Sequence, residues 1–557
     1  MDKVMGVADV LKLAVELSSK IASRYGCRIV ASALYGSRVA GYAKPSSDVD
    51  VLLILENYGK GILYLYEEYC GYLFAVLTVD KALFELDLEK GELGEFVVGR
   101  LLTPFIPIEG AEYLKEASVK FKMRVILETL TSLKFEYPEA YTDLRIKPEF
   151  FLYEKLWKRA SIYPPVKYSY SRILSDELKS KNLPVMMEGF MEALKKLEAE
   201  GIVRFENGYV VPVKSPDVKA SERVLSIFKE VERATRAYIT HGYAGRSMSP
   251  MKVAWEFASK VFRGSSLKGR GTLEQPELYI YLPSSAGYVS VLESFSPEAL
   301  TEKIQRFKGF KVESIEKLGG TLNFVDLITL RKNGELNRVV LKRFKDWYGF
   351  KWFPLSIWTL GVQKFALKGK TRMLKEYSAF IRLSKWNLPS PKIIYISLAD
   401  KLLLTEYIPG QTFDEVLSQL FSKDDVESST LEVCRSVGKA MAKVHNRGMV
   451  LGDPKPENIK LFDSKVYFLD LEQSSMGGDQ AWDLAELLYF TGHMTLSSKK
   501  AELYASSILD GYLEVGRGEI IRKITDAKYI RVFTMVAPPN VLLAISRVCK
   551  NYSTRKL

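Results

Sequence analysis

The stretch from residue 451 to residue 470 constrains the fold of this chain more than any other part of it. It reads LGDPKPENIKLFDSKVYFLD, so Asp453 is followed five positions later by Asn458, and Asp470 ends an apolar run after a short hairpin. Phosphoryl transfer from ATP needs this set, because one carboxylate orients the attacking hydroxyl while an amide and a second carboxylate hold magnesium. Lys455 is spaced to reach the transferring phosphate. The competing interpretation is a surface turn, since Asp, Pro and Asn often mark turns.

Two charged residues upstream favour a kinase over a surface turn. Lys342 ends the run Val-Val-Leu-Lys and has the form of the strand-borne lysine that pairs with phosphates. Glu376 lies in an amphipathic helical run, where it is placed to form an ion pair with Lys342.

Two further segments complete the order of parts expected in a kinase. Glu406 lies in the run from 402 to 410, which has the form of the strand and hinge that hold adenine. Gly319 and Gly320 stand between two β-rich runs, where a phosphate-covering loop belongs, although the full G-x-G-x-x-G is absent. The order of these segments predicts a bilobal, protein-kinase-like domain over residues 306–557.

The class of kinase is indicated by what the sequence lacks. Asp483 follows Asp470 by only thirteen positions, which leaves no room for an activation segment, and no Ala-Pro-Glu is present to dock a peptide. Residues 306–557 resemble the RIO kinases and the kinase subunit of the KEOPS complex, in which a short H-G-D…N segment precedes a strand-final Asp and a D-x-A-x-D-L helix. The resemblance implies ATP and Mg²⁺, held by Asn458 and Asp470, and leaves the acceptor open.

Three departures from that family stand in the same region. Leu451 replaces the histidine of H-G-D, which should not affect the chemistry. Lys455 replaces a small polar residue and matches conventional kinases, where a lysine holds the γ-phosphate. Asp470-Leu471-Glu472 replaces Asp-Phe-Gly, which argues against a flipping switch of the usual kind.

The N-terminus carries a second chemical signature over residues 20–110. A strand ends in Gly36-Ser37 at the start of a helix, and Asp48 and Asp50 are spaced to lie on one face of the next strand. Backbone N–H groups at a helix start suit a triphosphate, and paired aspartates suit divalent ions. The pattern resembles the DNA polymerase beta-type nucleotidyltransferases, whose usual third carboxylate is missing from the run 72–79. The alternatives are an active enzyme and a retained fold used for RNA binding or packing.

The middle of the chain predicts a nucleic-acid-binding module. Helical patterns at 148–160, 168–179 and 186–200 precede a hairpin signal, Asn207-Gly208. Three helices and a hairpin resemble a winged helix, which contacts nucleic acid or another protein, or serves only for packing. We therefore expect a multidomain α+β protein. Its parts are a nucleotidyltransferase-like α/β domain (1–143), a winged helix (144–215), a helical and basic linker (216–305) and the atypical kinase domain (306–557).

Composition indicates which partners and which cell compartment to expect. The net charge of +13 favours a polyanion, although abundant Lys and Glu also solvate thermostable surfaces. Four scattered cysteines without C-x-x-C indicate neither zinc nor a disulfide-linked partner. No signal peptide opens the chain and no apolar run is long enough to span a bilayer, so we expect a cytoplasmic protein without a membrane partner.

Together these parts resemble the archaeal RNA kinases that phosphorylate a ribose 2′-hydroxyl in the tRNA variable loop. The resemblance implies that Asp453 orients the hydroxyl, with structured RNA, most readily tRNA, as the partner. Three alternatives stay open: a RIO-like protein kinase or ATPase, an RNA-binding module with an ATP switch, and a nucleotidyltransferase acting through Asp48 and Asp50.

Overall fold

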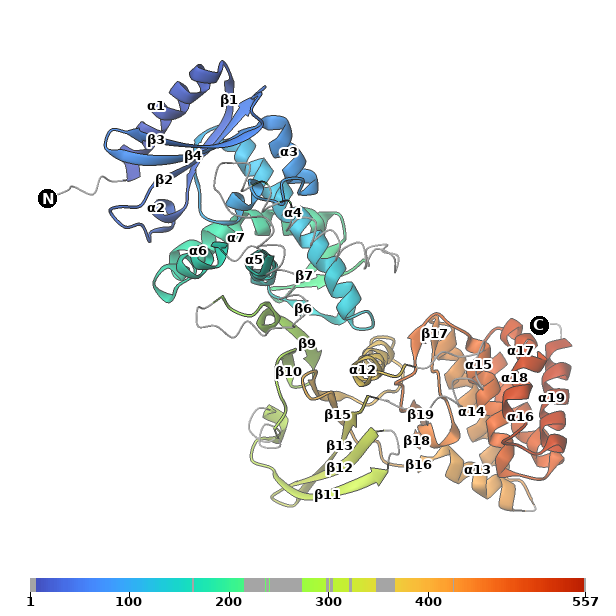
Figure 1. Ribbon diagram of the computed structural model, residues 1–557. Helices are drawn as coiled ribbons and strands as arrows, with labels where there is room; N and C mark the ends of the chain where they lie inside the picture. The colour runs from blue at the N-terminus through green and yellow to red at the C-terminus, as the bar shows by residue number, and fades with distance from the viewer. Residues whose placement is uncertain are drawn as a thin grey trace. The chain divides into compact units, whose positions relative to one another are not determined.

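The protein forms two compact units, Met1–Tyr281 and Leu282–Leu557 (Figure 1). The computed structural model describes residues 7–162, 165–214, 273–296, 304–319, 323–346, 366–423 and 425–554, and the single positions 236, 240 and 300. The expected basic stretches at 219–240, 242–249 and 263–271 lie outside the described residues, apart from positions 236 and 240. Within the described part of the chain, no helix is long and apolar enough to cross a membrane.

The first unit begins with a helix, a five-stranded sheet and further helices. Their bounds are α1 Val7–Tyr25, β1 Arg28–Tyr35, α2 Ser37–Ala40, β2 Val49–Glu56, β3 Ile62–Tyr69, β4 Tyr72–Asp80, α3 Lys81–Lys90, β5 Ile106–Glu109 and α4 Ala111–Glu136. The sheet order is β3-β4-β2-β1-β5, in which β2 and β4 are parallel and the other neighbours antiparallel. The expected strand, Gly-Ser turn, short helix and second strand are present. Strand β2 begins at Val49, however, so Asp48 precedes the strand instead of lying on it.

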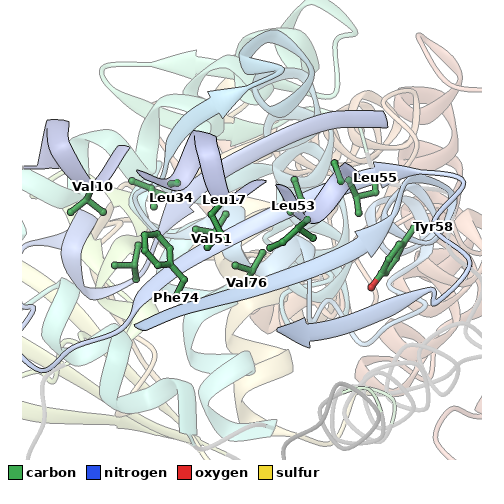
Figure 2. Packing of buried hydrophobic residues seen from close by; sticks show 13 residues of the cluster. Val10, Leu17, Leu34, Val51, Leu53, Leu55, Tyr58, Phe74 and Val76 are labelled. Carbon is green, nitrogen blue, oxygen red and sulfur yellow. The ribbon is translucent and has the colours of Figure 1, made fainter. Parts of the chain in front are cut away.

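Helix α1 covers one face of this sheet because its apolar residues recur at helical spacing. Four of them are buried against the strands (Figure 2): Val10, Ala14, Leu17 and Ile21. Their partners alternate along β2 and β4, which directs them to a single face: Val51, Leu53, Leu55, Phe74 and Val76. Each such buried side chain contributes roughly 1.5–3 kcal/mol, so this core fixes the strand that carries Asp50.

Helices and a hairpin follow within the same unit. Their bounds are β6 Arg145–Ile146, α5 Glu149–Ile162, α6 Pro165–Ile173, α7 Asp176–Ala199, β7 Val203–Glu206 and β8 Tyr209–Pro212. The predicted hairpin is present, and Asn207 and Gly208 both adopt positive φ, 50° and 80°, as its tight turn requires. Strand β8 also pairs with β6, which in turn pairs with the start of β9 (Ile280–Ser284).

The helices of this region divide at a different place from the one predicted. Instead of separate helices at 168–179 and 186–200, a break at Leu174-Ser175 precedes one continuous helix, α7. Pro184 lies inside α7, although a proline usually marks a helix boundary. The buried Asn182 side chain anchors α7 by donating to the carbonyls of Ile173 and Ala40 at 2.9 and 3.0 Å. Tertiary hydrogen bonding therefore overrides the local signal.

The second unit begins with strands and one long helix. Their bounds are β10 Gly287–Ser290, β11 Lys311–Gly319, β12 Asn323–Lys332, β13 Glu335–Phe344, α12 Gly369–Lys385, β14 Ile393–Ser397 and β15 Leu402–Glu406. Five of the strands form an antiparallel sheet in the order β11-β12-β13-β15-β14. Figure 1 shows α12 beside this sheet.

The rest of the second unit is mainly helical. Its elements are β16 Gln411–Thr412, α13 Phe413–Ser422, α14 Ser428–His445, β17 Met449–Val450, β18 Ile459–Phe462, β19 Lys465–Phe468, β20 Ser475–Met476, α15 Gln480–Ala485, α16 Ser498–Leu513, α17 Gly518–Ile524, α18 Ala527–Phe533 and α19 Pro539–Thr554. Helices α14 and α16 pack closely because each contributes a glycine: a Cβ at Gly438 would collide with the Ile508 carbonyl, and one at Gly511 with the Arg435 carbonyl. The predicted short hairpin between Asn458 and Asp470 is present as β18 and β19.

Candidate active site

Lys342 lies at the centre of a buried group of charges in the second unit. It is on β13, opposite Leu403 of β15, and its side chain is buried. Its ammonium group is 2.5 Å from Glu376 Oε2 on α12 and also contacts Asp470 Oδ1. A third carboxylate, Glu472 Oε2, lies 3.4 Å away. Because a buried charge is costly without partners, these carboxylates stabilise the ammonium group.

The same packing shifts the titration of this group. Burial raises the pKa of Glu376 to about 7, opposed by Lys342 and reinforced by Asp470 and Glu472. Burial alone would lower the pKa of Lys342, but the three carboxylates, Asp470 first, raise it well above its ordinary value. Lys342 therefore stays cationic at neutral pH, as a phosphate-binding lysine must.

Asn458 and Asp470 flank the β18–β19 hairpin, Asn458 just before it and Asp470 just after it. Asp470 is two residues past β19, with φ of 54°, a left-handed conformation that few residues other than glycine adopt. Leu469 N–H donates to the Asn458 carbonyl at 2.8 Å, which holds the two segments together. Carboxylate and amide oxygens are the ligands that Mg²⁺ prefers, so the donor set fits a magnesium site.

The predicted Asp453 and Lys455 form an ion pair, with 2.8 Å between Asp453 Oδ1 and Lys455 Nζ. Burial opposes the charge on Lys455, but Asp453 raises the pKa of Lys455 above its ordinary value. Asn458 Nδ2 donates to the Asp453 carbonyl at 3.0 Å, which joins this pair to the residues described above.

Asp483 supports this loop from the start of the following helix. Its buried carboxylate accepts hydrogen bonds from the N–H groups of Leu451 and Gly452 at 2.5 and 2.8 Å. His445, at the end of α14, lies between Asp483 and Tyr512, at 3.1 and 2.8 Å. The histidine thus has buried polar partners on both ring nitrogens and takes part in positioning the loop.

Six of the residues predicted from the sequence line one cavity of about 680 Å³, a volume typical of ligand sites. They are Gly319, Lys342, Glu376, Glu406, Asn458 and Asp470. Asp453 and Lys455 are not among the lining residues and adjoin the cavity through Asn458. Gly320 lies outside the described residues.

The hinge side of this cavity is held by backbone hydrogen bonds. Glu406 is the last residue of β15, and its N–H donates to the Lys392 carbonyl at 2.9 Å. The next N–H, of Tyr407, donates to Arg338 O at 3.3 Å. The backbone from Thr405 to Ile408 therefore forms a fixed wall of the cavity, as expected for a segment that receives a planar base.

Sequence reasoning missed a buried cluster beside Lys342. Arg372 is fully buried on α12, one turn before Glu376, and its guanidinium lies 2.8 Å from Glu472 Oε1 and 3.0 Å from Asn323 Oδ1. Asn323 also donates to Glu472 Oε2 at 2.7 Å. The available signals were the (i, i+4) spacing of Arg372 and Glu376, and the glutamate in place of glycine at position 472.

The N-terminal signature is only partly assembled. Asp50 lies on β2, and a Cβ at Gly36 would collide with its carboxylate, so the glycine is needed for this close approach. The parallel register places Ala75 opposite Asp50 on β4.

The carboxylate that β4 carries, Asp80, lies too far along the strand to join Asp50 in a metal site. Asp80 is opposite Leu55, five residues past Ala75, which is about 16 Å at the rise of a strand. Its carboxylate instead accepts from the N–H groups of Tyr58 and Ala82, both at 2.8 Å, and caps α3.

Comparison with curated proteins finds relatives of the second unit. The KEOPS complex subunit Bud32 of Pyrococcus abyssi is 27% identical over 156 residues, which are 27% of this chain and 66% of that protein. A probable serine/threonine-protein kinase BUD32 homolog of Archaeoglobus fulgidus is 25% identical over 137 residues, 24% of this chain and 63% of that protein. The chain thus spans just under two thirds of these relatives' lengths. The homologues are kinase-like proteins of the Bud32 type.

A third relative carries tRNA in its name. The probable bifunctional tRNA threonylcarbamoyladenosine biosynthesis protein of Methanococcus vannielii is 26% identical over 156 residues, 27% of this chain and 26% of that protein. No family model matches the chain. A solved structure of WaaP in complex with acyl carrier protein covers 46% of this chain and 97% of its own, at 14% identity and a TM-score of 0.27, which is too low to support a shared fold.

Proposed function

We propose that this protein is an ATP-dependent kinase that transfers the γ-phosphate to a structured RNA, at a ribose 2′-hydroxyl of tRNA. The observation that carries the proposal is the cavity lined by Lys342, Glu376, Asn458 and Asp470, adjoined by the Asp453–Lys455 pair. These are the parts that phosphoryl transfer uses to position and neutralise its reactants.

Each residue then has a defined task. Lys342, braced by Glu376, pairs with the α- and β-phosphates, and Lys455 steadies the γ-phosphate. Asn458 and Asp470 hold Mg²⁺, which when bound neutralises charge on the phosphates. Asp453 orients the 2′-hydroxyl and receives its proton as the O2′–Pγ bond forms and the bond from Pγ to the bridging oxygen of ADP breaks.

Three observations favour RNA over a peptide as the acceptor. The chain has a net charge of +13, which suits a polyanion. The short segment between Asp470 and Asp483 leaves no platform for a peptide. One relative is named for tRNA threonylcarbamoyladenosine biosynthesis. In this proposal the nucleotidyltransferase-like and winged-helix parts of the first unit bind the RNA and determine which ribose reaches Asp453.

The test is to incubate the protein with total small RNA and ATP labelled at the γ position, and in parallel with α-labelled NTPs. We expect γ label in RNA that survives phenol extraction and is lost on nuclease digestion. Label in the protein fraction alone would instead support a RIO-like protein kinase; the Archaeoglobus fulgidus relative is named as a probable serine/threonine-protein kinase.

Nucleotidyl transfer by the first unit is disfavoured by the register of its strands. Ala75 stands opposite Asp50, and Asp80 caps a helix about five residues away along β4. Two metal ions about 3.5–4 Å apart need more negative charge than two aspartates provide. We expect the double variant Asp48→Asn, Asp50→Asn to keep the kinase reaction. Incorporation of α-labelled nucleotide by the wild type, absent in this variant, would contradict the assignment.

A further inference from the structure

A buried glutamate that the proposed reaction does not use lies directly behind the catalytic loop. Glu486 follows α15, three residues after Asp483, and its side chain is 4% exposed. It begins a π-helical segment, Glu486–Phe490, in which the helix widens by one residue per turn. Such segments are rare and occur often at functional sites.

The Glu486 carboxyl group lies against the carboxyl group of Asp453, where a hydrogen bond joins the two if one of them carries a proton. Two carboxylates cannot form this bond without a proton between them, because each is then an acceptor only. Glu486 Oε2 is buried and accepts no hydrogen bond from any donor among the described residues. An ionised carboxylate with a bare buried oxygen would be far more costly than a neutral acid.

The surroundings determine which of the two groups carries the proton. Asp453 is about a quarter exposed and paired with Lys455. Glu486 is buried and faces Asp453 and Asp483, whose negative charges outnumber the single cation Lys455 on that side. Burial, followed by the charge of Asp453, raises the pKa of Glu486 well above its ordinary value. The proton therefore resides on Glu486 and the charge on Asp453.

The same π-helical segment also supports the other member of the ion pair. Lys455 Nζ lies 5.4 Å from the centre of the Phe490 ring, at the end of the segment that begins with Glu486. One short segment thus contacts both Asp453 and Lys455.

We propose that Glu486 is a positioning residue for phosphoryl transfer, which as a neutral acid donates a hydrogen bond to Asp453 and so fixes the carboxylate that faces the acceptor hydroxyl. This inference rests on the proposed role of Asp453 and does not depend on the acceptor being RNA. Fixing the carboxylate sets the direction of the oxygen that meets the hydroxyl, and a misplacement of about 1 Å can cost on the order of a hundredfold in rate.

The test compares Glu486→Gln with Glu486→Leu in the full-length protein. Glutamine keeps a neutral donor, so we expect its kcat to stay within about threefold of wild type. Leucine fills the space without a donor, so kcat should fall roughly 10- to 100-fold, while KM for ATP and for acceptor changes less than about twofold. Leu488→Met, a buried substitution of similar volume in the same segment, is the control and should behave as wild type. Thermal melting with ATP checks that every variant is folded.

The reaction is followed in two ways, as label transfer to RNA and as ATP hydrolysis without RNA, with Asp453→Ala as the blank. Wild-type kcat in Glu486→Leu would overturn the inference. So would a Glu486→Gln variant as slow as the leucine variant, or an effect confined to KM. Failure of the wild type to label RNA would instead overturn the RNA proposal, because the Glu486 comparison is still read from Asp453-dependent hydrolysis. A wild type with neither activity would overturn both.

Discussion

Asp453 and Asp470 are the residues on which the proposed reaction depends most directly. In the proposed reaction Asp453 faces the acceptor hydroxyl and Asp470 the metal, whereas basic surface elsewhere would bind the RNA. We expect Asp453→Ala and Asp470→Ala each to abolish transfer while leaving RNA affinity within a few-fold. Lys342→Ala should cost on the order of a hundredfold, because a clamp on transferring phosphates supplies several kcal/mol. Single-turnover labelling and filter binding measure the two effects, and wild-type turnover by Asp453→Ala would contradict the assignment.

Lys122 gives the first unit a stability that depends on pH. It is buried on α4, where its Nζ donates to the Met186 carbonyl at 3.1 Å, and burial lowers the pKa of Lys122 to about 8. Between pH 8 and the ordinary lysine pKa of 10.5, the unfolded chain binds the extra proton, so stability rises with pH. Below pH 8 Lys122 is charged in both the folded and the unfolded chain, and burying this charge lowers the free energy of unfolding by its full amount, about 3 kcal/mol.

This dependence can be measured by urea denaturation at several values between pH 7.5 and pH 10. We expect the wild type to gain stability across this range and Lys122→Met to lose most of the gain. Lys120→Met is the matched control, because Lys120 is exposed on the same helix and should leave the slope unchanged. Equal slopes in the wild type and Lys122→Met would show that Lys122 is not the cause.

At the residue scale, the sequence was informative where chemistry fixes the spacing. Lys342, Glu376, Asn458 and Asp470 are recognisable from their order along the chain, and the structure brings them to one cavity. Glu486 was not identified, because its role depends on a π-helical turn and on burial behind the loop, neither of which leaves a pattern in the sequence.

At the scale of elements, the Glu472 cluster joins three parts of the kinase-like unit. Glu472 binds Arg372 on α12 and Asn323 at the start of β12, next to the expected phosphate loop. Replacing it with glycine, the residue usual in Asp-Phe-Gly, leaves the guanidinium of a fully buried arginine without its carboxylate. Breaking a buried pair in this way costs about 3–5 kcal/mol.

We therefore expect Glu472→Gly to lower the melting temperature strongly and to weaken ATP binding. The control is Glu313→Gln, which breaks an exposed pair with Arg331 and should leave the melting temperature nearly unchanged. A double variant, Arg372→Met with Glu472→Leu, should recover part of the loss because no buried charge is left alone. A glycine variant as stable as wild type would show that the cluster does not hold these elements together.

Among the elements, hairpins were predictable and helix boundaries were not. Asn207-Gly208 predicted its turn because only residues that tolerate positive φ fit there. The continuity of α7 through Pro184 was missed, because the Asn182 side chain that anchors it reaches the Ala40 carbonyl, which is distant in sequence. Similarly, β2 begins one residue after Asp48, which periodicity cannot resolve.

At the scale of the whole molecule, the charge of +13 predicts how RNA binding responds to salt. Each phosphate that the protein neutralises releases counterions and adds close to one unit of negative slope to a plot of log affinity against log salt. We expect tRNA affinity to fall steeply between about 50 and 200 mM KCl, with a slope of several units. Fluorescence anisotropy with labelled tRNA measures it, and a flat response would contradict the polyanion interpretation.

The short connection from Asp470 to Asp483 has a consequence for regulation. Strand β20 within it pairs with β17, and Asp479 is hydrogen-bonded to Tyr529 of α18, so the connection is held at two places along its length. Kinases that are switched by phosphorylation use a long segment at this place, which is ordered in one state and released in another. A chain without such a segment has no loop at this place that phosphorylation could order or release. We expect its output in the cell to follow the supply of protein, nucleotide and acceptor, as in a housekeeping enzyme, instead of an upstream signal.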